Sequence, residues 1–182
     1  MVTEESDEAL LRRCQGGDSS AFEVLVARYE RPLYNAAYRV LGNADDARDV
    51  TQVAFMEVAK GLNGYDPNHR LFSWIYRIAL NAALNLLRRN VREEPLGDDD
   101  AARIEPVTPE SRAVESEVSR RIQGALMQMS EDHRVVVTLR HFSGCSYRKI
   151  SLILGIEEKT VKSRLFEARQ HLRELLVDLE RE

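Results

Sequence analysis

Apolar residues recur three or four positions apart over most of the first 92 residues, and this spacing predicts four amphipathic helices. The first is expected at 6–13, where Ser6 can serve as the N-cap. The second is expected at about 19–40, with Pro32 as a candidate kink. Asn43 can cap the third, and the fourth should cover about 71–92, after a loop at 61–70 that breaks the pattern.

The same period returns in residues 118–182. Helices are expected at 118–129, at 131–142 and at 147–154, and a turn at Gly155 should lead into one more helix. Alternation with period two is limited to the short run VVVTL, which lies inside a helical context. The chain is therefore predicted to be all-α, with two small helical domains.

The segment between these two units differs from both in composition. Residues 93–117 hold 9 acidic and 2 basic side chains, three prolines and almost no large apolar residue. Such a segment cannot bury enough surface to offset the entropy of ordering, which predicts a flexible acidic linker. The expected domains are therefore 1–92 and 118–182, joined by the linker 93–117.

Charge is distributed unevenly along the chain. The net charge is −4, but residues 1–92 are balanced and residues 118–182 hold 12 basic and 9 acidic side chains. Most of the negative charge therefore lies in the linker, and the overall sign does not argue against a nucleic-acid partner.

Composition excludes several other classes of protein. The longest apolar runs are far shorter than the roughly 20 residues that span a bilayer, and the acidic N-terminus lacks the basic start of a signal peptide. A cytoplasmic protein without membrane insertion is expected. The sequence has no phosphate-binding glycine loop, nucleophile elbow or paired catalytic carboxylates, so the chain is not expected to be an enzyme. His141 and Cys145 lack further ligands nearby in sequence, so no metal and no cofactor are expected.

Residues 147–169 have the pattern of a helix-turn-helix motif, in which the second helix lies in the DNA major groove. Apolar residues of both helices form a small core. The opposite face of the second helix carries a hydroxyl, an aromatic ring and several cations: Lys159, Lys162, Ser163, Phe166 and Arg169. A merely solvated face would explain the charges, but it would not need Phe166. The pattern therefore favours DNA reading.

The predicted helix at 71–92 carries a second polar stripe. Its members recur at spacings of four, four, three and four and share one face: Arg77, Asn81, Asn85, Arg88 and Arg92. Cations suit a phosphate backbone, asparagine amides can pair with base edges, and Trp74 and Tyr76 add aromatic surface. An amphipathic helix with ordinary exposed arginines explains this stripe equally well when it is taken alone.

The run SYRKISLILGIEEKTVKSRLFEARQHLR resembles region 4 of bacterial RNA polymerase sigma factors, specifically the extracytoplasmic-function (ECF) group of the sigma-70 family. It departs from the family pattern at Glu157, often proline there, and at Lys159, often glycine. The resemblance implies that this helix reads the −35 promoter element. The residues implied as contacts are Lys159, Thr160, Lys162, Ser163, Arg164, Phe166 and Arg169.

The run RLFSWIYRIALNAALNLLRR similarly resembles the part of sigma region 2 that recognises and melts the −10 element. The resemblance implies that the preceding loop, 66–70, captures a base flipped out of the duplex. The residues implied as contacts are Asn68, His69, Arg70, Trp74, Tyr76, Arg77, Asn81, Asn85 and Arg88.

The run GNADDARDVTQVAFMEVAKGL resembles the helix by which these factors bind the clamp of core RNA polymerase, and the matching residues are Asp46, Asp49, Gln52 and Phe55. Arg48 and Val53 stand where the family usually has glutamates, which predicts weakened docking. Thr51 lies between them, and its phosphorylation would add negative charge, so we hypothesise a phosphosite there. Ordinary surface variation is the favoured alternative.

The resemblance implies core RNA polymerase and promoter DNA as partners. It leaves open whether an anti-sigma factor or a regulatory kinase controls the chain. A stand-alone helix-turn-helix repressor with a helical dimerisation domain is the main alternative, and a protein-binding adaptor is another. The Arg/Asn stripe at 77–92 argues against the repressor, because a dimerisation helix does not need such a face.

Overall fold

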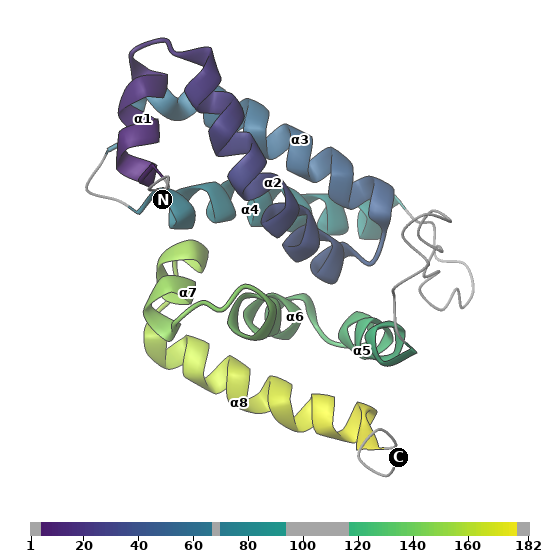
Figure 1. Ribbon diagram of the computed structural model, residues 1–182. Helices are drawn as coiled ribbons and strands as arrows, with labels where there is room; N and C mark the ends of the chain where they lie inside the picture. The colour runs from purple at the N-terminus through teal and green to yellow at the C-terminus, as the bar shows by residue number, and fades with distance from the viewer. Residues whose placement is uncertain (1–4, 67–69, 94–116, 178–182) are drawn as a thin grey trace.

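The computed structural model describes residues 5–66, 70–93 and 117–177, and the regular structure in these ranges is helical throughout. This confirms the all-α prediction. Two groups of helices are stacked on each other, with α1–α4 forming one and α5–α8 the other (Figure 1). The predicted linker falls almost wholly in 94–116, outside the described residues. Among the helices that are described, none is both long and apolar enough to cross a membrane.

The N-terminal group consists of α1 (Asp7–Gln15), α2 (Ser19–Leu41), α3 (Ala44–Gly61), a short 3-10 turn η1 (Leu62–Gly64) and α4 (Leu71–Glu93). The apolar stripe of each helix faces a shared core, whose fully buried members include Leu10, Leu25, Leu33, Ala54 and Ile75. Burial of such side chains is the main source of stability in a unit of this size. All four helices were predicted from their period, with end points within two residues of those observed.

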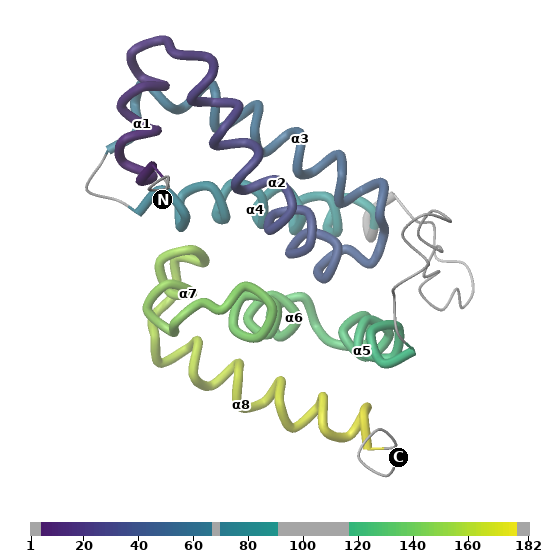
Figure 2. Tube along the Cα trace, in the orientation of Figure 1, coloured from purple at the N-terminus to yellow at the C-terminus, as the bar shows by residue number. Residues whose placement is uncertain are grey.

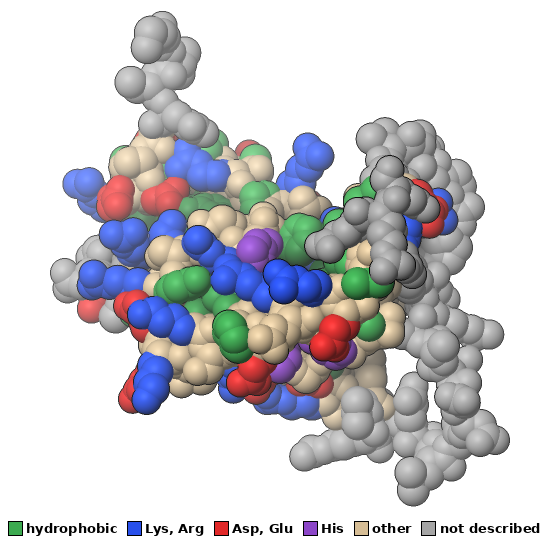
Figure 3. Space-filling view, turned by 90° about the horizontal axis from the view of Figure 1, so that it is seen from below, with side chains coloured by type: hydrophobic (Ala, Val, Ile, Leu, Met, Phe, Trp, Pro, Cys, Tyr) green, Lys and Arg blue, Asp and Glu red, His purple; other side chains and the backbone are tan. Residues whose placement is uncertain are grey.

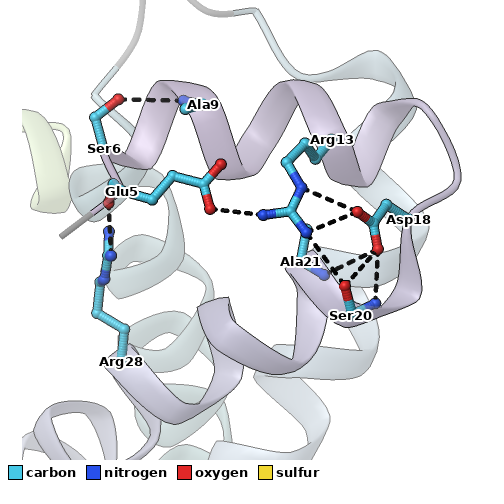
Figure 4. Close-up of polar contacts among 8 residues, drawn as sticks. All are labelled: Glu5, Ser6, Ala9, Arg13, Asp18, Ser20, Ala21 and Arg28. Carbon is cyan, nitrogen blue, oxygen red and sulfur yellow. Dashed lines mark hydrogen bonds and ion pairs between the residues drawn. The ribbon is translucent and has the colours of Figure 1, made fainter. Parts of the chain in front are cut away.

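Polar caps explain where these helices begin. Ser6 Oγ accepts a hydrogen bond from the backbone N–H of Ala9, and Asn43 Oδ1 accepts from the first turn of α3, as the sequence predicts. The cap of α2 is Asp18, which the sequence did not single out. Its carboxylate accepts from the N–H groups of Ser20 and Ala21 and from the guanidinium of Arg13 (Figure 4).

The C-terminal group consists of α5 (Glu117–Met127), α6 (Glu131–Val137), a π-helical turn η3 (Thr138–Phe142), α7 (Tyr147–Leu154) and α8 (Glu158–Leu175). The single helix predicted at 131–142 therefore has two parts. In the second part the turn is widened, and the N–H of Ser143 reaches back to the carbonyl of Thr138, while that of Cys145 reaches Leu139. This turn changes the chain direction ahead of α7.

The two groups are in direct contact along their length. The trace shows α5, α6 and α7 following the side of the N-terminal group formed by α2 and α4 (Figure 2). Helix α8 lies beyond them, on the far side from α1–α4 (Figure 1). One long face of α8 is therefore free of the N-terminal group.

Candidate nucleic-acid interface

Helices α7 and α8 meet at a tight corner. Gly155 ends α7 in the left-handed conformation, with φ of 67°, and its N–H bonds to the carbonyl of Ser151. The hydroxyl of Ser151 donates to the carbonyl of Ile156 at 2.6 Å and fixes the chain beyond the glycine. A glycine tolerates this conformation where other residues are strained. The predicted helix-turn-helix geometry is thus present.

Four side chains form the small core behind the corner and orient α8. Ile150 and Ile153 of α7 pack with Val161 and Leu165 of α8, and each is at most 1% exposed. This packing determines which side of α8 faces the interior of the protein. The opposite side is consequently presented to solvent.

The outward side of α8 carries the predicted DNA-reading residues. Five of them are exposed: Lys159, Lys162, Ser163, Phe166 and Arg169. Phe166 is 64% exposed, the largest value among the exposed large apolar side chains of the described residues. Seen from the side of α8, lysine and arginine side chains extend across the face of the molecule (Figure 3). The face combines cations for phosphates with a hydroxyl and an apolar ring for base edges.

Two residues predicted for this face lie elsewhere on the helix. The guanidinium of Arg164 pairs with the carboxylate of Asp132 in α6 at 2.7 Å, and its side chain is 27% exposed. Arg164 therefore ties α8 to α6. Thr160 is half-buried on the same flank.

Gln170 is a residue of this face that the sequence reading missed. It is exposed and stands four positions beyond Phe166. Helical spacing places it on one line with Lys159, Ser163 and Phe166, so the 3.6-residue period could have identified it. A glutamine amide is suited to pairing with adenine in the major groove.

His141, from the π-helical turn, lies beside the end of this face. The Arg169 Nε–H points at His141 Nε2, at 3.5 Å. Partial burial lowers the pKa of His141, and the charges of Arg169 and Arg140 lower it further. The imidazole is therefore held in its neutral form beside Arg169 at neutral pH.

The polar stripe of α4 is present as predicted from the spacing. Asn81, Asn85 and Arg88 are exposed on one side of the helix, and Arg70 is exposed just before it. Arg77 is also exposed, but its guanidinium donates to the carbonyl of Leu152 at the end of α7. The predicted contacts Asn68 and His69, and the side chain of Arg92, lie outside the described residues.

The two aromatic residues predicted to support unstacked bases are not open to solvent. Trp74 is half-buried and packs on Tyr65, with ring centroids 4.7 Å apart. Tyr76 is 2% exposed, stacks on Phe72 and pairs with Ser143 of the C-terminal group, and this burial raises the pKa of its hydroxyl. In this arrangement Tyr76 is covered by the C-terminal group, and its predicted role as a stacking surface stays a prediction.

The predicted polymerase-docking residues fall on both sides of α3. Gln52 and Phe55 line a groove of about 680 Å³ between α2 and α3. Asp46 and Asp49 line a second, smaller groove between α3 and α4. The larger groove is mostly apolar, and its walls include Phe22, Val26, Tyr34, Phe55 and Met56. Met56 was not predicted, although it is 59% exposed in the middle of the helix.

The structure does not favour the hypothesised phosphosite at Thr51. The side chain of Thr51 is 5% exposed, and its hydroxyl donates to the carbonyl of Ala47 at 2.7 Å. A kinase needs access to the hydroxyl that it phosphorylates, whereas the Thr51 hydroxyl is hydrogen-bonded to the backbone of its own helix.

Arg48 does not stand as an isolated cation on the docking helix. Its guanidinium pairs with Asp45, three residues earlier, at 2.6 Å, and both side chains are largely exposed. An exposed pair of this kind contributes little to stability, but it offsets part of the positive charge. The repulsion expected from Arg48 is reduced accordingly.

The sigma-70 family models match both halves of the chain. Sigma-70 region 2 matches residues 25–93, and Sigma-70, region 4 matches residues 119–172. The RNA polymerase sigma-H factor of Pseudomonas aeruginosa is 33% identical over 192 aligned residues, with 100% of both chains covered. The ECF RNA polymerase sigma-E factor of Escherichia coli K12 is 32% identical over 175 residues, with 91% of both chains covered.

Solved structures agree with this arrangement of helices. The structure of CnrH in complex with the cytosolic domain of CnrY superposes with a TM-score of 0.75 at 27% identity and covers 96% of this chain and 99% of CnrH. RpoE of Bartonella quintana, solved with the anti-sigma factor NepR, has the same fold, with a TM-score of 0.71 at 24% identity, covering 85% of this chain and 96% of RpoE.

The chain is similar to a sigma factor over its whole length and matches both conserved sigma regions. These findings exclude the stand-alone repressor and the adaptor. The chain belongs to the sigma-70 family of RNA polymerase sigma factors, in its extracytoplasmic-function group.

Proposed function

We propose that this sigma factor binds core RNA polymerase through α3 and the groove beside it, reads duplex −35 DNA with α8, and holds the melted −10 strand along α4. The observation that carries the proposal is the outward face of α8, where Phe166 stands exposed among cations and a hydroxyl. The polymerisation chemistry belongs to the polymerase, and the chain acts by binding.

The duplex-reading role follows from the shape and chemistry of α8. Its free face is long enough to lie in a major groove, and Lys159, Lys162 and Arg169 can contact phosphates or guanine edges. Ser163 and Gln170 can form hydrogen bonds with bases, and Phe166 can contact a thymine methyl group. We assign no DNA contact to Arg164, because Asp132 already holds it.

The strand-binding role rests on the exposed part of the α4 stripe. Asn81 and Asn85 offer amides to unpaired base edges, while Arg77 and Arg88 offer charge to the backbone. Trp74 has a supporting role in this surface, because it packs on Tyr65 and so shapes the corner between α3 and α4. Arg70, exposed just before α4, extends this surface.

The docking role rests on the apolar groove between α2 and α3. An exposed methionine beside aromatic walls is typical of a surface that receives a partner helix. Asp49 and Gln52 are exposed on the same helix and can add polar contacts at the rim. By analogy with CnrH, which binds the cytosolic domain of CnrY, a regulatory protein such as an anti-sigma factor is a further expected partner.

Transcription initiation by the reconstituted complex tests the proposal. Core RNA polymerase and the purified chain are incubated with genomic DNA fragments, and the 5′ ends of the transcripts are sequenced. We expect start sites that share two sequence blocks at a fixed separation. The variants Ser163→Ala and Phe166→Ala should weaken the sequence preference in the upstream block only. Asn81→Ala and Asn85→Ala should weaken the sequence preference in the downstream block only.

These four positions are exposed, so the substitutions should leave folding intact. Gln128→Ala, at an exposed position in the turn after α5 and outside both faces, is the control and should preserve the sequence preference in both blocks. Transcription no greater than that of core enzyme alone would contradict the proposed function. If both sets of variants lost the sequence preference in the same block, the assignment of the upstream block to α8 and of the downstream block to α4 would be contradicted.

A further inference from the structure

A carboxylate stands on the outward face of α8, among residues that suit a phosphate backbone. Glu167 is exposed, and its side chain keeps 63% of its surface open to solvent. Acidic side chains lie among the cations on the side of the molecule seen from below (Figure 3). Because a carboxylate repels phosphate groups, Glu167 weakens DNA binding by α8 unless it meets a hydrogen-bond donor on the DNA.

The position of Glu167 around the helix follows from the side chains that point inward. Three residues of this part of α8 are buried: Val161, Leu165 and Ala168. Successive residues of an α-helix turn by about 100°, so Ser163 and Gln170 lie opposite the buried side. Phe166 and Glu167 lie on the two sides of that line, each about 50° away from it. Glu167 is therefore as close to the centre of the outward face as Phe166 is.

The two edges of this face differ in chemistry. Lys162 and Arg169 are exposed on the edge beyond Phe166 and can contact phosphates. The opposite edge, beyond Glu167, lies next to α6, and His133 Nε2 of that helix is 3.3 Å from Glu167 Oε2. The carboxylate thus stands on the side of the face away from these two cations.

The contact with α6 restrains Glu167 without burying it. His133 approaches Oε2, and a carboxylate has a second oxygen, Oε1, that can accept from another donor. Arg164 differs, because its side chain is only 27% exposed and pairs with Asp132 at 2.7 Å. A long side chain loses rotamer freedom when it binds, and one that is already restrained loses less. Glu167 is therefore held in place and still open to a ligand.

The donor pattern of the major groove limits which base a carboxylate can meet. Guanine presents the acceptors O6 and N7, and thymine presents the acceptor O4, so both repel it. Adenine offers the N6 amino group, but its acceptor N7 lies beside that group. Cytosine offers the N4 amino group without an acceptor of its own in the groove. Cytosine is therefore the base that suits the carboxylate of Glu167.

We propose that Glu167 determines specificity in the upstream promoter block by accepting a hydrogen bond from N4 of a cytosine. The inference rests on the proposed duplex-reading role of α8. It places a base contact on the side of the Ser163–Gln170 line opposite to Phe166. At the position that Glu167 reads, guanine and thymine are excluded by repulsion between acceptors.

The test uses the full chain bound to core RNA polymerase and one promoter identified by sequencing of transcript start sites. The upstream block of this promoter is randomised, and the sequences of the template pool and of the transcribed templates give the base preference at each position. The variants are Glu167→Gln and Glu167→Ala. The matched control is Glu23→Gln, which makes the same chemical change at an exposed position of α2.

Wild type and Glu23→Gln should prefer cytosine about tenfold at one position of the block. Glu167→Gln should move the preference at this position to adenine, because a glutamine amide pairs with both N6 and N7 of adenine. Glu167→Ala should leave the position without a preference. The other positions should keep their bases in all four chains, which shows that α8 is folded and still reads the block.

An unchanged preference at every position in both Glu167 variants would overturn the inference. A uniform rise in transcription from all sequences with Glu167→Ala would also overturn it, because the carboxylate would then act only by repelling phosphates. A position that responds to both variants but holds guanine or thymine in wild type would contradict the assignment of cytosine. If wild type showed no preference anywhere in the upstream block, the proposed role of α8 would be the part that failed, and the inference would fall with it.

Discussion

At the scale of single residues, the cap at the start of α2 depends on a charge. Hydrogen bonds from Ser20 and Arg13 to the Asp18 carboxylate lower its pKa from 3.8 to about 2. A carboxyl group whose pKa is lower in the folded chain stabilises that chain above its unfolded pKa and loses this contribution as the pH falls through the folded value. The contribution is therefore complete above about pH 4 and is lost toward pH 2.

Asp18→Asn keeps an oxygen that can cap α2 and removes the charge. Its melting temperature should lie below that of wild type at pH 6, and the difference should shrink as the pH falls from about 4 toward 2. Circular dichroism melts over this range provide the measurement. Glu23→Gln, at an exposed position on the same helix, should melt like wild type at each pH. A difference that stays constant with pH would contradict the assignment of the effect to the charge.

Thr51 provides a second residue-scale prediction. Replacement of this buried side chain by glutamate puts a larger, charged group where a hydroxyl bonded to the carbonyl of Ala47 is enclosed. We expect Thr51→Glu to lower the free energy of unfolding by about 1–3 kcal/mol in urea titrations. Thr51→Val, which keeps the shape and removes the hydroxyl, should cost less. A Thr51→Glu chain as stable as wild type would contradict the enclosure of this side chain and would favour the phosphosite hypothesis.

Residue roles could be predicted where their partners are near in sequence. The caps Ser6 and Asn43 were identified because each bonds to the helix that follows it. The contacts that Arg164 and Tyr76 make in the structure were not predicted, because their partners, Asp132 and Ser143, lie 32 and 67 positions away in the chain. No local pattern indicates such pairings.

At the scale of elements, period and turn chemistry were sufficient for most helices. The bounds of α7, Tyr147–Leu154, match the prediction because a serine precedes the helix and a left-handed glycine ends it. The π-helical turn at Thr138–Phe142 was not predicted, because its apolar spacing continues that of α6. A π turn is set by tertiary packing and has no simple sequence signal.

The corner between α7 and α8 should depend on the left-handed backbone of Gly155. A Cβ atom at this position would meet nothing within 4 Å, so Gly155→Ala adds no clash and only forces a left-handed alanine. We expect a loss of about 1–2 kcal/mol in the free energy of unfolding. Gly64→Ala is the matched control: it also has open space but no positive φ, and it should be neutral or slightly stabilising. Equal effects of the two substitutions would argue against the left-handed corner.

At the scale of the whole molecule, the spacing of apolar residues could not predict how the two groups of helices pack on each other. Gln123 and Arg134 were not singled out in the sequence, yet both are buried where α5 and α6 meet the end of α2. Most of their partners are backbone carbonyls, which carry no sequence signal, and the side-chain partner of Gln123 is Arg39, 84 positions away. The proposed functional faces were predictable because they are exposed and periodic, whereas the burial of Tyr76 follows only from the packing of the groups.

The central claim is that the chain is a sigma factor that docks on core RNA polymerase through the groove between α2 and α3. Binding of the labelled chain to purified core enzyme, titrated by fluorescence anisotropy, tests it most directly. Met56→Glu places a charge in the groove, and Val24→Glu places the same charge on an exposed position of α2 outside it. We predict that wild type and Val24→Glu bind alike and that Met56→Glu binds at least about tenfold more weakly. A wild-type chain that fails to bind core enzyme, or equal binding by all three chains, would contradict the claim.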